Sequence, residues 1–592
     1  MSAPIGYQRF RKPNLEKMAS QQISIDNSYE PFNLANFQGY NPVYSRFFDM
    51  DADNFNLISL NHKYQVADLC TLYDQDGKKV KQDVFVKFSP LLDPLKFITG
   101  KYNLKDPRIT MLPSLDVDAC LPKIANSNNC SYTDAFFSYL TNLLLEKHGF
   151  VHGVPFYGSA LAVQDRFRFN LADDLDFAKE SDFFMANVGK CFTLDETAEV
   201  LVRDFSGSGS RTNRQKIAIL DNDALNDAFI DVEEIADSFC AETVANTDAE
   251  LEYEKVVEPH EPLEEKEDDK ESSSSEESSG SSCSDETESS EGSEEGSSEG
   301  SGEGRSDKGS GSDWETESET NTEFEKEEPV YSYLHNFPVQ MIFQERCTGT
   351  FDELLMKRAL GTDAMVAALF QITMILLTYQ KAFDFTHNDL HTNNIMYVNT
   401  SETHINYCFD NTWYRVPTHG RIFKIIDFGR AIYRFQDKVF CSDSFAPSGD
   451  AYSQYNCEPF FNESKPRLDP NYSFDLCRLG CSLYDFVTDD DEGATPPLAL
   501  PHPPHTSNPV DTLIKKWCSD DDDKNVVYKK NGQERYPNFK LYKMIARTVH
   551  GHSPKSQLTS PVFAAFVQSG KTLSGDGIVI NIDEIPKYKF TK

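Results

Sequence analysis

The chain has 592 residues and a net charge of −38, from 95 Asp and Glu against 57 Lys and Arg. This length accommodates a large folded domain together with a long insertion. Gln371 and Thr373 interrupt the best apolar stretch, so the composition predicts no membrane span. The 13 cysteines include no Cys-x-x-Cys pair, which favours a reducing compartment and no cysteine-based metal site.

Two strands are predicted early in the chain. Residues 64–73 alternate apolar and polar side chains in the manner of one strand, and Gln75–Lys78 have the composition of a turn. A second apolar strand is predicted over Asp83–Phe88, and it carries Lys87. Other lysines lie nearby, but Lys87 lies within the apolar strand. An ordinary exposed strand lysine is the alternative interpretation.

A helix is predicted over Ser131–Lys147, because its apolar residues recur on one side. Two acidic residues of this helix are candidates to pair with Lys87, namely Asp134 in the first turn and Glu146 in the last. The spacing to the next predicted strand, Phe156–Gly158, favours Asp134. The alternative is that Asp134 only complements the positive end of the helix dipole.

Two insertions are predicted after this strand. Residues 163–240 contain several phenylalanines and are expected to fold in part as a cap or subdomain. Residues 241–330 hold 32 Asp and Glu against 6 Lys and Arg, and their Ser, Glu and Gly content predicts disorder. This segment is either a solvated spacer or a phosphorylation target, since Ser274, Ser275 and Ser284 stand before acids. Its charge repels nucleic acid, so no nucleic-acid partner is expected.

The second half of the chain begins with a strand predicted at Val339–Gln344, followed by Glu345, Arg346 and Cys347. A long apolar helix is predicted from Ala364 to Ala382. Shorter strands are predicted at Ile395–Val398 and Ile422–Ile426, with an additional pair of strands between them at Tyr407–Val416.

The residues with the most specific chemistry lie in two short segments. His387-Asn388-Asp389-Leu390-His391-Thr392-Asn393-Asn394 follows the long helix, and Asp427-Phe428-Gly429 follows a strand. Phosphoryl transfer requires a positioned nucleophile and a metal ion that neutralises charge, with little covalent chemistry by the protein. Asp389 is suited to accept or orient a hydroxyl proton. Asn394 and Asp427 offer the hard oxygen ligands that Mg²⁺ prefers.

These two segments resemble the catalytic loop and the metal-binding triplet of protein kinases. Ser473–Tyr484 resembles the kinase helix whose buried aspartate, here Asp475, holds the backbone of the catalytic loop. The strand with Lys87 resembles the kinase strand whose lysine pairs with the α- and β-phosphates of ATP. The resemblance further implies that the Glu345 carbonyl and the Cys347 amide contact adenine in the segment that links two lobes.

The resemblance implies an α+β fold with two lobes, a small antiparallel-sheet lobe and a mainly helical lobe. Residues 1–50 would be an N-terminal extension, and residues 51–162 with 331–347 would form the small lobe and hinge. Residues 348–592 would form the helical lobe. The implied cofactors are ATP and Mg²⁺, bound by Lys87, Asp134, Glu345, Cys347, Asn394 and Asp427, with Asn394 and Asp427 as the metal ligands.

Three departures from the kinase pattern are visible. No Gly-x-Gly-x-x-Gly precedes the Lys87 strand, and residues 58–64 stand in its place without the glycines that let backbone amides approach phosphate. Asn388 replaces the usual arginine, so a phosphorylated activation loop has no arginine partner there. His391 replaces a common lysine, and it either contacts the γ-phosphate or only fills the site.

Three functions remain open from the sequence. The first is transfer of the ATP γ-phosphate to Ser or Thr hydroxyls of a protein substrate, with Asp389, Lys87 and His391 as catalytic residues. The second is a pseudokinase that binds partners without turnover. The third is a kinase of small molecules, because His-Asn-Asp-Leu-His also resembles the catalytic loop of such kinases. The long, proline-containing segment 430–472 favours a protein substrate instead.

The additional strands, the sequence around Asp427 and residues 534–542 further resemble kinase-like proteins of large DNA viruses. This resemblance covers most of the chain outside the acidic insertion. It implies a viral protein made in the host cytoplasm, with packaging into virions as an open alternative.

Overall fold

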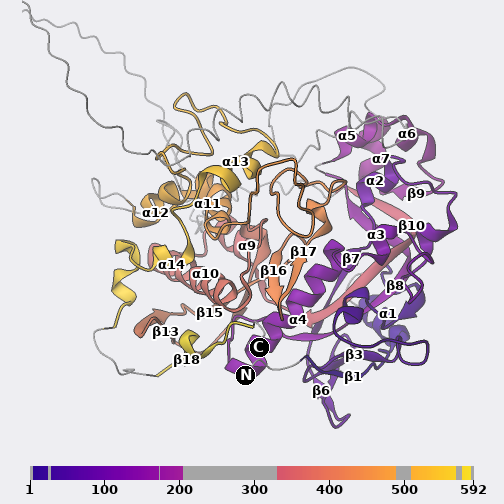
Figure 1. Ribbon diagram of the computed structural model, residues 1–592, viewed down its shortest axis with the longest axis horizontal. Helices are drawn as coiled ribbons and strands as arrows, with labels where there is room; N and C mark the ends of the chain where they lie inside the picture. The colour runs from indigo at the N-terminus through magenta and orange to yellow at the C-terminus, as the bar shows by residue number, and fades with distance from the viewer. Residues whose placement is uncertain are drawn as a thin grey trace, which may run out of the picture. The chain divides into compact units, whose positions relative to one another are not determined.

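The computed structural model describes residues 5–23, 29–172, 174–203, 330–487, 508–568 and 576–588. The chain divides into two compact units, and all of these residues belong to the unit formed by Met1–Asn222 and Glu327–Lys592. They form a mixed α+β structure with several small sheets, in which antiparallel pairing predominates (Figure 1). The predicted α+β class is therefore confirmed.

The bounds of the elements are as follows. The helices are α1 (Leu15–Ile23), α2 (Pro94–Ile98), α3 (Pro122–Ala125), α4 (Cys130–His148), α5 (Leu175–Lys179), α6 (Asp182–Asn187), α7 (Glu196–Arg203), α9 (Phe351–Met356), α10 (Thr362–Phe383), α11 (Phe474–Val487), α12 (Pro509–Trp517), α13 (Lys540–Thr548) and α14 (Pro554–Gln557). The strands are β1 (Tyr7–Arg9), β2 (Leu34–Gln38), β3 (Ile58–Leu60), β4 (Gln65–Asp68), β5 (Thr71–Tyr73), β6 (Lys79–Lys81), β7 (Val84–Pro90), β8 (Phe156–Asn170), β9 (Phe192–Leu194), β10 (Tyr331–Glu345), β11 (Gly349–Thr350), β12 (Ile395–Asn399), β13 (His404–Phe409), β14 (Thr412–Pro417), β15 (Arg421–Ile425), β16 (Ile432–Phe435), β17 (Lys438–Cys441) and β18 (Ile578–Asn581).

The largest sheet has the order β2-β8-β10-β7, and its paired neighbours are antiparallel. β7 pairs with β10 at one end, and β9 pairs with the same edge of β10 at the other end. β8 continues through residues 163–170, so the boundary expected at residue 163 lies inside a strand. β2 belongs to the first 50 residues, so part of the expected extension is an edge strand of this sheet.

The two insertions are described in part. Residues 171–203 fold into α5, α6, β9 and α7, and buried Phe184 and Phe192 stack on each other. Leu220 and Phe229, which the sequence also assigns to this folded part, lie outside the described residues. The acidic segment 241–330 also lies outside them except for Val330, which is buried and accepts a hydrogen bond from the Leu171 amide.

The alternating side chains of β10 separate two apolar clusters. Met341 and Phe343 pack into a smaller cluster with residues of α1, β4 and β5, whereas Ile342 belongs to the main core. Cross-strand partners point to the same face of a sheet, and Lys87 is paired in register with Ile342. Lys87 therefore points to the face of the sheet that α4 covers.

The prediction of one strand over residues 64–73 is wrong. The structure has two short strands, β4 and β5, joined by a turn at Leu69 and Cys70. The Asp68 carboxylate accepts a hydrogen bond from the Cys70 amide at 3.0 Å, which stabilises the turn in the manner of an Asx turn. The turn predicted at Gln75–Lys78 is confirmed, and Gly77 supplies its left-handed residue with φ of 80°.

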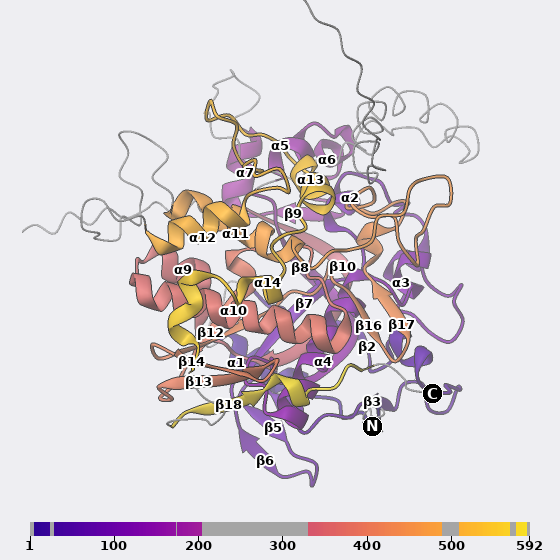
Figure 2. The same cartoon turned by 60° about the vertical axis from the view of Figure 1, so that its left-hand side comes forward.

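The helices α12 and α14 pack against α10, and α11 packs against α12 and α13 (Figures 1 and 2). By length and composition α10 could cross a membrane, but 83% of its most apolar window is buried inside the protein, as in an ordinary core helix. Gln371 in this helix is fully buried and accepts a hydrogen bond from the Phe423 amide at 3.1 Å. The polar residue that interrupts the apolar stretch thus holds β15, the strand that leads to Asp427.

The pair of strands predicted at Tyr407–Val416 is confirmed as the antiparallel hairpin of β13 and β14. The strand β18 from the C-terminal part of the chain adds to β13 in parallel. The strands predicted at Ile395–Val398 and Ile422–Ile426 correspond to β12 and β15, which pair with each other.

We expect Gly153→Ala to destabilise the protein. A Cβ at this position would lie 2.2 Å from the Thr141 carbonyl oxygen of α4, which is backbone and cannot rotate away. Overpacking of this kind lowers the free energy of unfolding by about 1–3 kcal/mol, measurable by denaturant unfolding. Gly551→Ala is the matched control, because its Cβ would meet no atom within 4 Å. Equal stabilities of the two variants would contradict the predicted clash.

Candidate active site

Lys87 bridges two carboxylates at the centre of the site. Its Nζ atom lies 2.7 Å from Asp134 Oδ2 and 2.9 Å from Asp427 Oδ1. Burial opposes the charge on Lys87, but the two carboxylates outweigh it and raise the pKa of Lys87. Of the two acids considered from the sequence, Asp134 is thus the partner. Glu146 instead accepts a hydrogen bond from the Lys63 amide at 3.0 Å.

The second oxygen of Asp134 binds the backbone of the Asp-Phe-Gly segment. The Phe428 amide donates to Asp134 Oδ1 at 2.9 Å, and the Asp134 residue is only 2% exposed. One short side chain on α4 therefore holds both the β7 lysine and the residue after Asp427. The dipole-only interpretation of Asp134 does not account for these two contacts.

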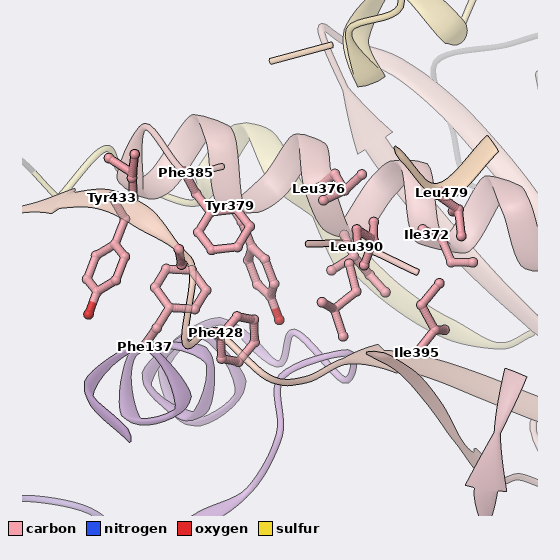
Figure 3. Packing of buried hydrophobic residues seen from close by; sticks show 14 of the residues in the cluster. Phe137, Ile372, Leu376, Tyr379, Phe385, Leu390, Ile395, Phe428, Tyr433 and Leu479 are labelled. Carbon is pink, nitrogen blue, oxygen red and sulfur yellow. The ribbon is translucent and has the colours of Figure 1, made fainter. Parts of the chain in front are cut away.

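Asp427 is held in an unusual backbone conformation. Its φ is 64°, in the left-handed region that costs a non-glycine residue about 1–2 kcal/mol. The buried ring of Phe428 anchors the segment against Phe137 at 4.6 Å and Phe385 at 6.0 Å between centroids (Figure 3). Burial opposes ionisation of Asp427, but the charge and hydrogen bond of Lys87 prevail and lower its pKa to about 2.

The backbone of the loop before Asp389 is held by Asp475. The carboxylate of Asp475 accepts hydrogen bonds from the amides of His387 and Asn388, each at 2.9 Å, and the residue is fully buried. Asn388 is also left-handed, with φ of 64°. The contact that the resemblance assigned to Asp475 is confirmed, and it holds the loop in a conformation that a free chain would rarely adopt.

Asn394 and Asp427 come together because β12 and β15 are antiparallel. Ile395 pairs with Ile425, which places the start of β12 beside the end of β15. The Asn394 side-chain amide donates to the Asp389 carbonyl at 2.9 Å, which orients its own oxygen away from that bond.

Two oxygen ligands fit Mg²⁺, because proteins commonly hold this ion through one or two side chains while phosphates and water complete the octahedron. Among the described residues, no group of three or more His, Cys, Asp and Glu side chains is arranged to bind a metal.

Asp389 is surrounded by groups that sequence reasoning missed. Tyr542 Oη donates to Asp389 Oδ1 at 2.8 Å, and Arg430 Nε lies 3.9 Å from Oδ2. Burial raises the pKa of Asp389, but the charges of Arg430 and Arg478 outweigh it, so the net shift is downward. Arg478 lies three residues after Asp475 on α11 and therefore on the same face of this helix. Helical periodicity is thus the sequence signal that could have identified it.

His391 is close enough to both Asp389 and Asp427 to feel their charges. Burial lowers its pKa, while the charges of Asp389 and Asp427 act in the opposite direction. Its side chain makes no hydrogen bond with the residues that the structure describes. The imidazole is therefore neutral near pH 7 and has a ring nitrogen to offer to a ligand.

The segment after β10 is tied to β15 by a buried ion pair. Lys424 Nζ lies 2.8 Å from Glu345 Oε2 and donates to the Gly153 carbonyl at 2.9 Å. The sequence did not single out Lys424. The Cys347 amide makes no hydrogen bond within the described part of the chain. Burial raises the pKa of the Cys347 thiol to about 11, so this cysteine stays protonated.

The stretch that stands in place of a glycine-rich loop is held by hydrogen bonds, two of them to distant parts of the chain. The Asn61 amide donates to the Gly6 carbonyl at 2.9 Å, and His62 Nδ1 lies 2.6 Å from the Tyr64 carbonyl. With the bond from the Lys63 amide to Glu146, residues 61–64 are tied to two other segments, the one that holds Gly6 and the end of α4.

The segment after Gly429 is joined to the N-terminus of α4. Asp443 Oδ2 lies 2.7 Å from Lys123 Nζ, and Asp443 Oδ1 accepts a hydrogen bond from the Cys130 amide at 3.0 Å. Lys123 and Asp443 are 320 positions apart, so no local pattern in the sequence pointed to this pair. The contact fixes the helix that carries Asp134.

No protein-family model matches the chain, and no curated protein matches it as a relative. The function is therefore inferred from the contacts of the chain itself.

We expect Asp475→Asn to loosen the loop that carries Asp389. The asparagine keeps one acceptor oxygen but turns its NH₂ toward a backbone amide, which leaves a buried donor unpaired. The free energy of unfolding should fall by about 1–3 kcal/mol, measured by denaturant unfolding. Asp485→Asn on the same helix is the control, because Asp485 is exposed and accepts its hydrogen bond from Tyr528 at the surface. Similar losses in both variants would contradict the anchoring function.

Proposed function

We propose that the protein is an ATP- and Mg²⁺-dependent protein kinase that transfers the γ-phosphate to Ser or Thr hydroxyls of protein substrates. The observation that carries the proposal is the joint contact of Asp134 with Lys87 and with the Phe428 amide. This contact assembles a phosphate-binding lysine, a helix carboxylate and the Asp-Phe-Gly segment, which kinase catalysis requires together.

The proposal includes a two-lobed arrangement. The sheet of β7, β8 and β10 with α4 would be the small lobe, and the helices around α10 would be the large one. Residues 345–347 would link them, with adenine bound by the Glu345 carbonyl and the Cys347 amide. The tie between Lys424 and Glu345 supports this assignment, because it sets the position of the linking segment relative to β15.

Each candidate residue has a distinct task in the proposed reaction. Lys87 would bind the α- and β-phosphates, and Asn394 and Asp427 would hold Mg²⁺. The metal supplies neutralisation of the charge on the phosphate oxygens. Asp389 would orient the acceptor hydroxyl and take its proton as the new O–P bond forms and the bond to the β-phosphate oxygen breaks, releasing ADP. The lowered pKa of Asp389 keeps it ionised for this task.

His391 would donate a hydrogen bond to the γ-phosphate as a neutral imidazole. Its electrostatic interaction with both Asp389 and Asp427 supports this function over mere space filling. The ordered segment of residues 430–472 supports a protein acceptor over a small molecule. A viral protein of the host cytoplasm remains part of the proposal, on the resemblance described above.

A pseudokinase that binds partners without turnover is the second candidate. The tethered, glycine-free segment at residues 61–64 favours it, because backbone amides there cannot close freely over phosphate. The two candidates differ in turnover.

We expect the purified protein to label itself or a generic protein substrate from γ-labelled Mg-ATP. Asp389→Asn should reduce the single-turnover rate by about 10²–10⁴-fold, the usual contribution of a general base. Asp363→Asn is the control, since Asp363 is exposed in the first turn of α10. Labelling that survives in Asp389→Asn would refute the assigned mechanism.

A thermal-shift measurement separates the two candidates. Stabilisation by Mg-ATP without labelling by the wild type would favour the pseudokinase. The absence of both stabilisation and labelling would exclude any function with ATP.

We expect His391→Gln to keep labelling within a few-fold of wild type, because a glutamine can still donate to phosphate. His391→Leu should lose about 10–100-fold, the effect of one hydrogen bond to a charged group. The measurement is the same single-turnover rate at saturating Mg-ATP. If the two variants are equally active, His391 only fills the site.

A further inference from the structure

The oxygen Oδ1 of Asp389 is held by Tyr542, which is itself held by Arg478. Tyr542 Oη donates to Asp389 Oδ1 at 2.8 Å, and Arg478 Nε donates to Tyr542 Oη at 2.9 Å. Tyr542 lies on α13 and Arg478 lies on α11. The three side chains thus form one continuous line of hydrogen bonds that ends on the candidate catalytic residue.

The direction of this line is fixed by chemistry. A guanidinium has only donors, so the Tyr542 oxygen must accept from Arg478, and the tyrosine proton is directed to Asp389. A hydroxyl that accepts from a cation becomes a stronger donor, because adjacent hydrogen bonds polarise each other. The arrangement stabilises the ionised carboxylate in one orientation.

Tyr542 is a buried core residue whose ring is held by its neighbours. It is 2% exposed, and its ring stacks on Phe539 at 5.4 Å and lies 6.2 Å from Phe474. The Arg478 guanidinium lies 5.2 Å from the centroid of the same ring. These contacts leave the hydroxyl with little freedom, so it serves Asp389 as a fixed donor.

The other oxygen of Asp389, Oδ2, is left to bind the substrate hydroxyl that accepts the phosphate. Arg430 Nε is 3.9 Å from Oδ2, beyond hydrogen-bond distance, and the Arg430 guanidinium is bonded to Asp450. The Asp389 side chain is 23% exposed. One oxygen is therefore immobilised while the carboxylate still reaches solvent.

The neighbouring Asn388 does not supply a charge to this site. Its side chain donates to the Arg430 carbonyl at 2.9 Å and accepts from Tyr455 Oη at 2.8 Å, inside the protein. The positive charges near Asp389 come instead from Arg430 and Arg478. These arginines lie 41 and 89 positions further along the chain from Asp389.

We propose that Tyr542 is a positioning residue for Asp389 and that Arg478 orients the Tyr542 hydroxyl. The inference rests on the proposed kinase function and adds to it a line of hydrogen bonds that aims the carboxylate at the acceptor hydroxyl. It assigns a positioning function to α13, which carries none of the proposed nucleotide-binding or metal-binding residues.

The test is Tyr542→Phe, which keeps the stacked ring and removes only the hydroxyl. We expect kcat to fall about 10–100-fold, the effect of one hydrogen bond to a charged group. The KM for ATP and the stabilisation by Mg-ATP should stay at wild-type values, because Lys87, Asn394 and Asp427 are untouched. Tyr528→Phe is the control, since Tyr528 also donates to a carboxylate, that of Asp485, away from this site.

A double-mutant cycle separates positioning from a structural effect. In the Asp389→Asn background, Tyr542→Phe should cause no further loss, because the residue acts through Asp389. Arg478→Lys keeps the charge but not the Nε geometry, so as a single variant it should lower kcat. Combined with Tyr542→Phe, it should cause little further loss of kcat. This second variant keeps the inference testable if Tyr542→Phe unfolds.

Three outcomes would overturn the inference. Wild-type kcat in Tyr542→Phe refutes the positioning function alone, as does an additive loss in the Asp389→Asn background. A wild-type protein that binds Mg-ATP but never labels refutes the proposed kinase function, and the positioning function falls with it.

Discussion

The candidate active site depends on the two contacts made by the buried carboxylate of Asp134. One oxygen accepts from Lys87 on β7, and the other accepts from the Phe428 amide, while the residue itself stands just past the first turn of α4. A buried carboxylate is tolerated only when its oxygens are paired, and removal of a partner leaves an uncompensated charge. A strand, a helix and the segment that carries Asp427 are therefore positioned together, because a shift of any one would break a buried contact.

A buried carboxylate also holds the loop that carries Asn388 and Asp389. Asn388 and Asp427 both have left-handed backbones, which a chain of L-residues rarely adopts without support. Asp475 binds the Asn388 amide, and Asp134 binds the amide that follows Asp427. The hydrogen bonds to buried carboxylates thus offset the backbone strain at Asn388 and Asp427, two residues that lie in the candidate site. Around Asp389 the balance of charge comes from Arg430 and Arg478, in the absence of an arginine at position 388.

Much of the local structure was predictable from periodicity. The helices α4 and α10 and the strands β7, β12 and β15 lie within a few residues of their predicted positions, because their apolar patterns are long or have clear ends. The single strand predicted at residues 64–73 is wrong, because the Asp68 side chain stabilises a turn that the apolar alternation does not reveal. The boundary at residue 163 lies inside β8, since that strand continues as long as its partner β10 does.

The sequence by itself determined the chemical types in the site and their order along the chain: Lys87, Asp134, Asp389, Asn394, Asp427 and Asp475. Tertiary structure decided which of them meet and what surrounds them. Tyr542 reaches Asp389 across 153 positions, and Lys123 reaches Asp443 across 320. Local patterns state which face of an element is buried, but not which distant element covers it. Those partners are set only when sheets and helices pack, because each contact depends on the position of every element between them.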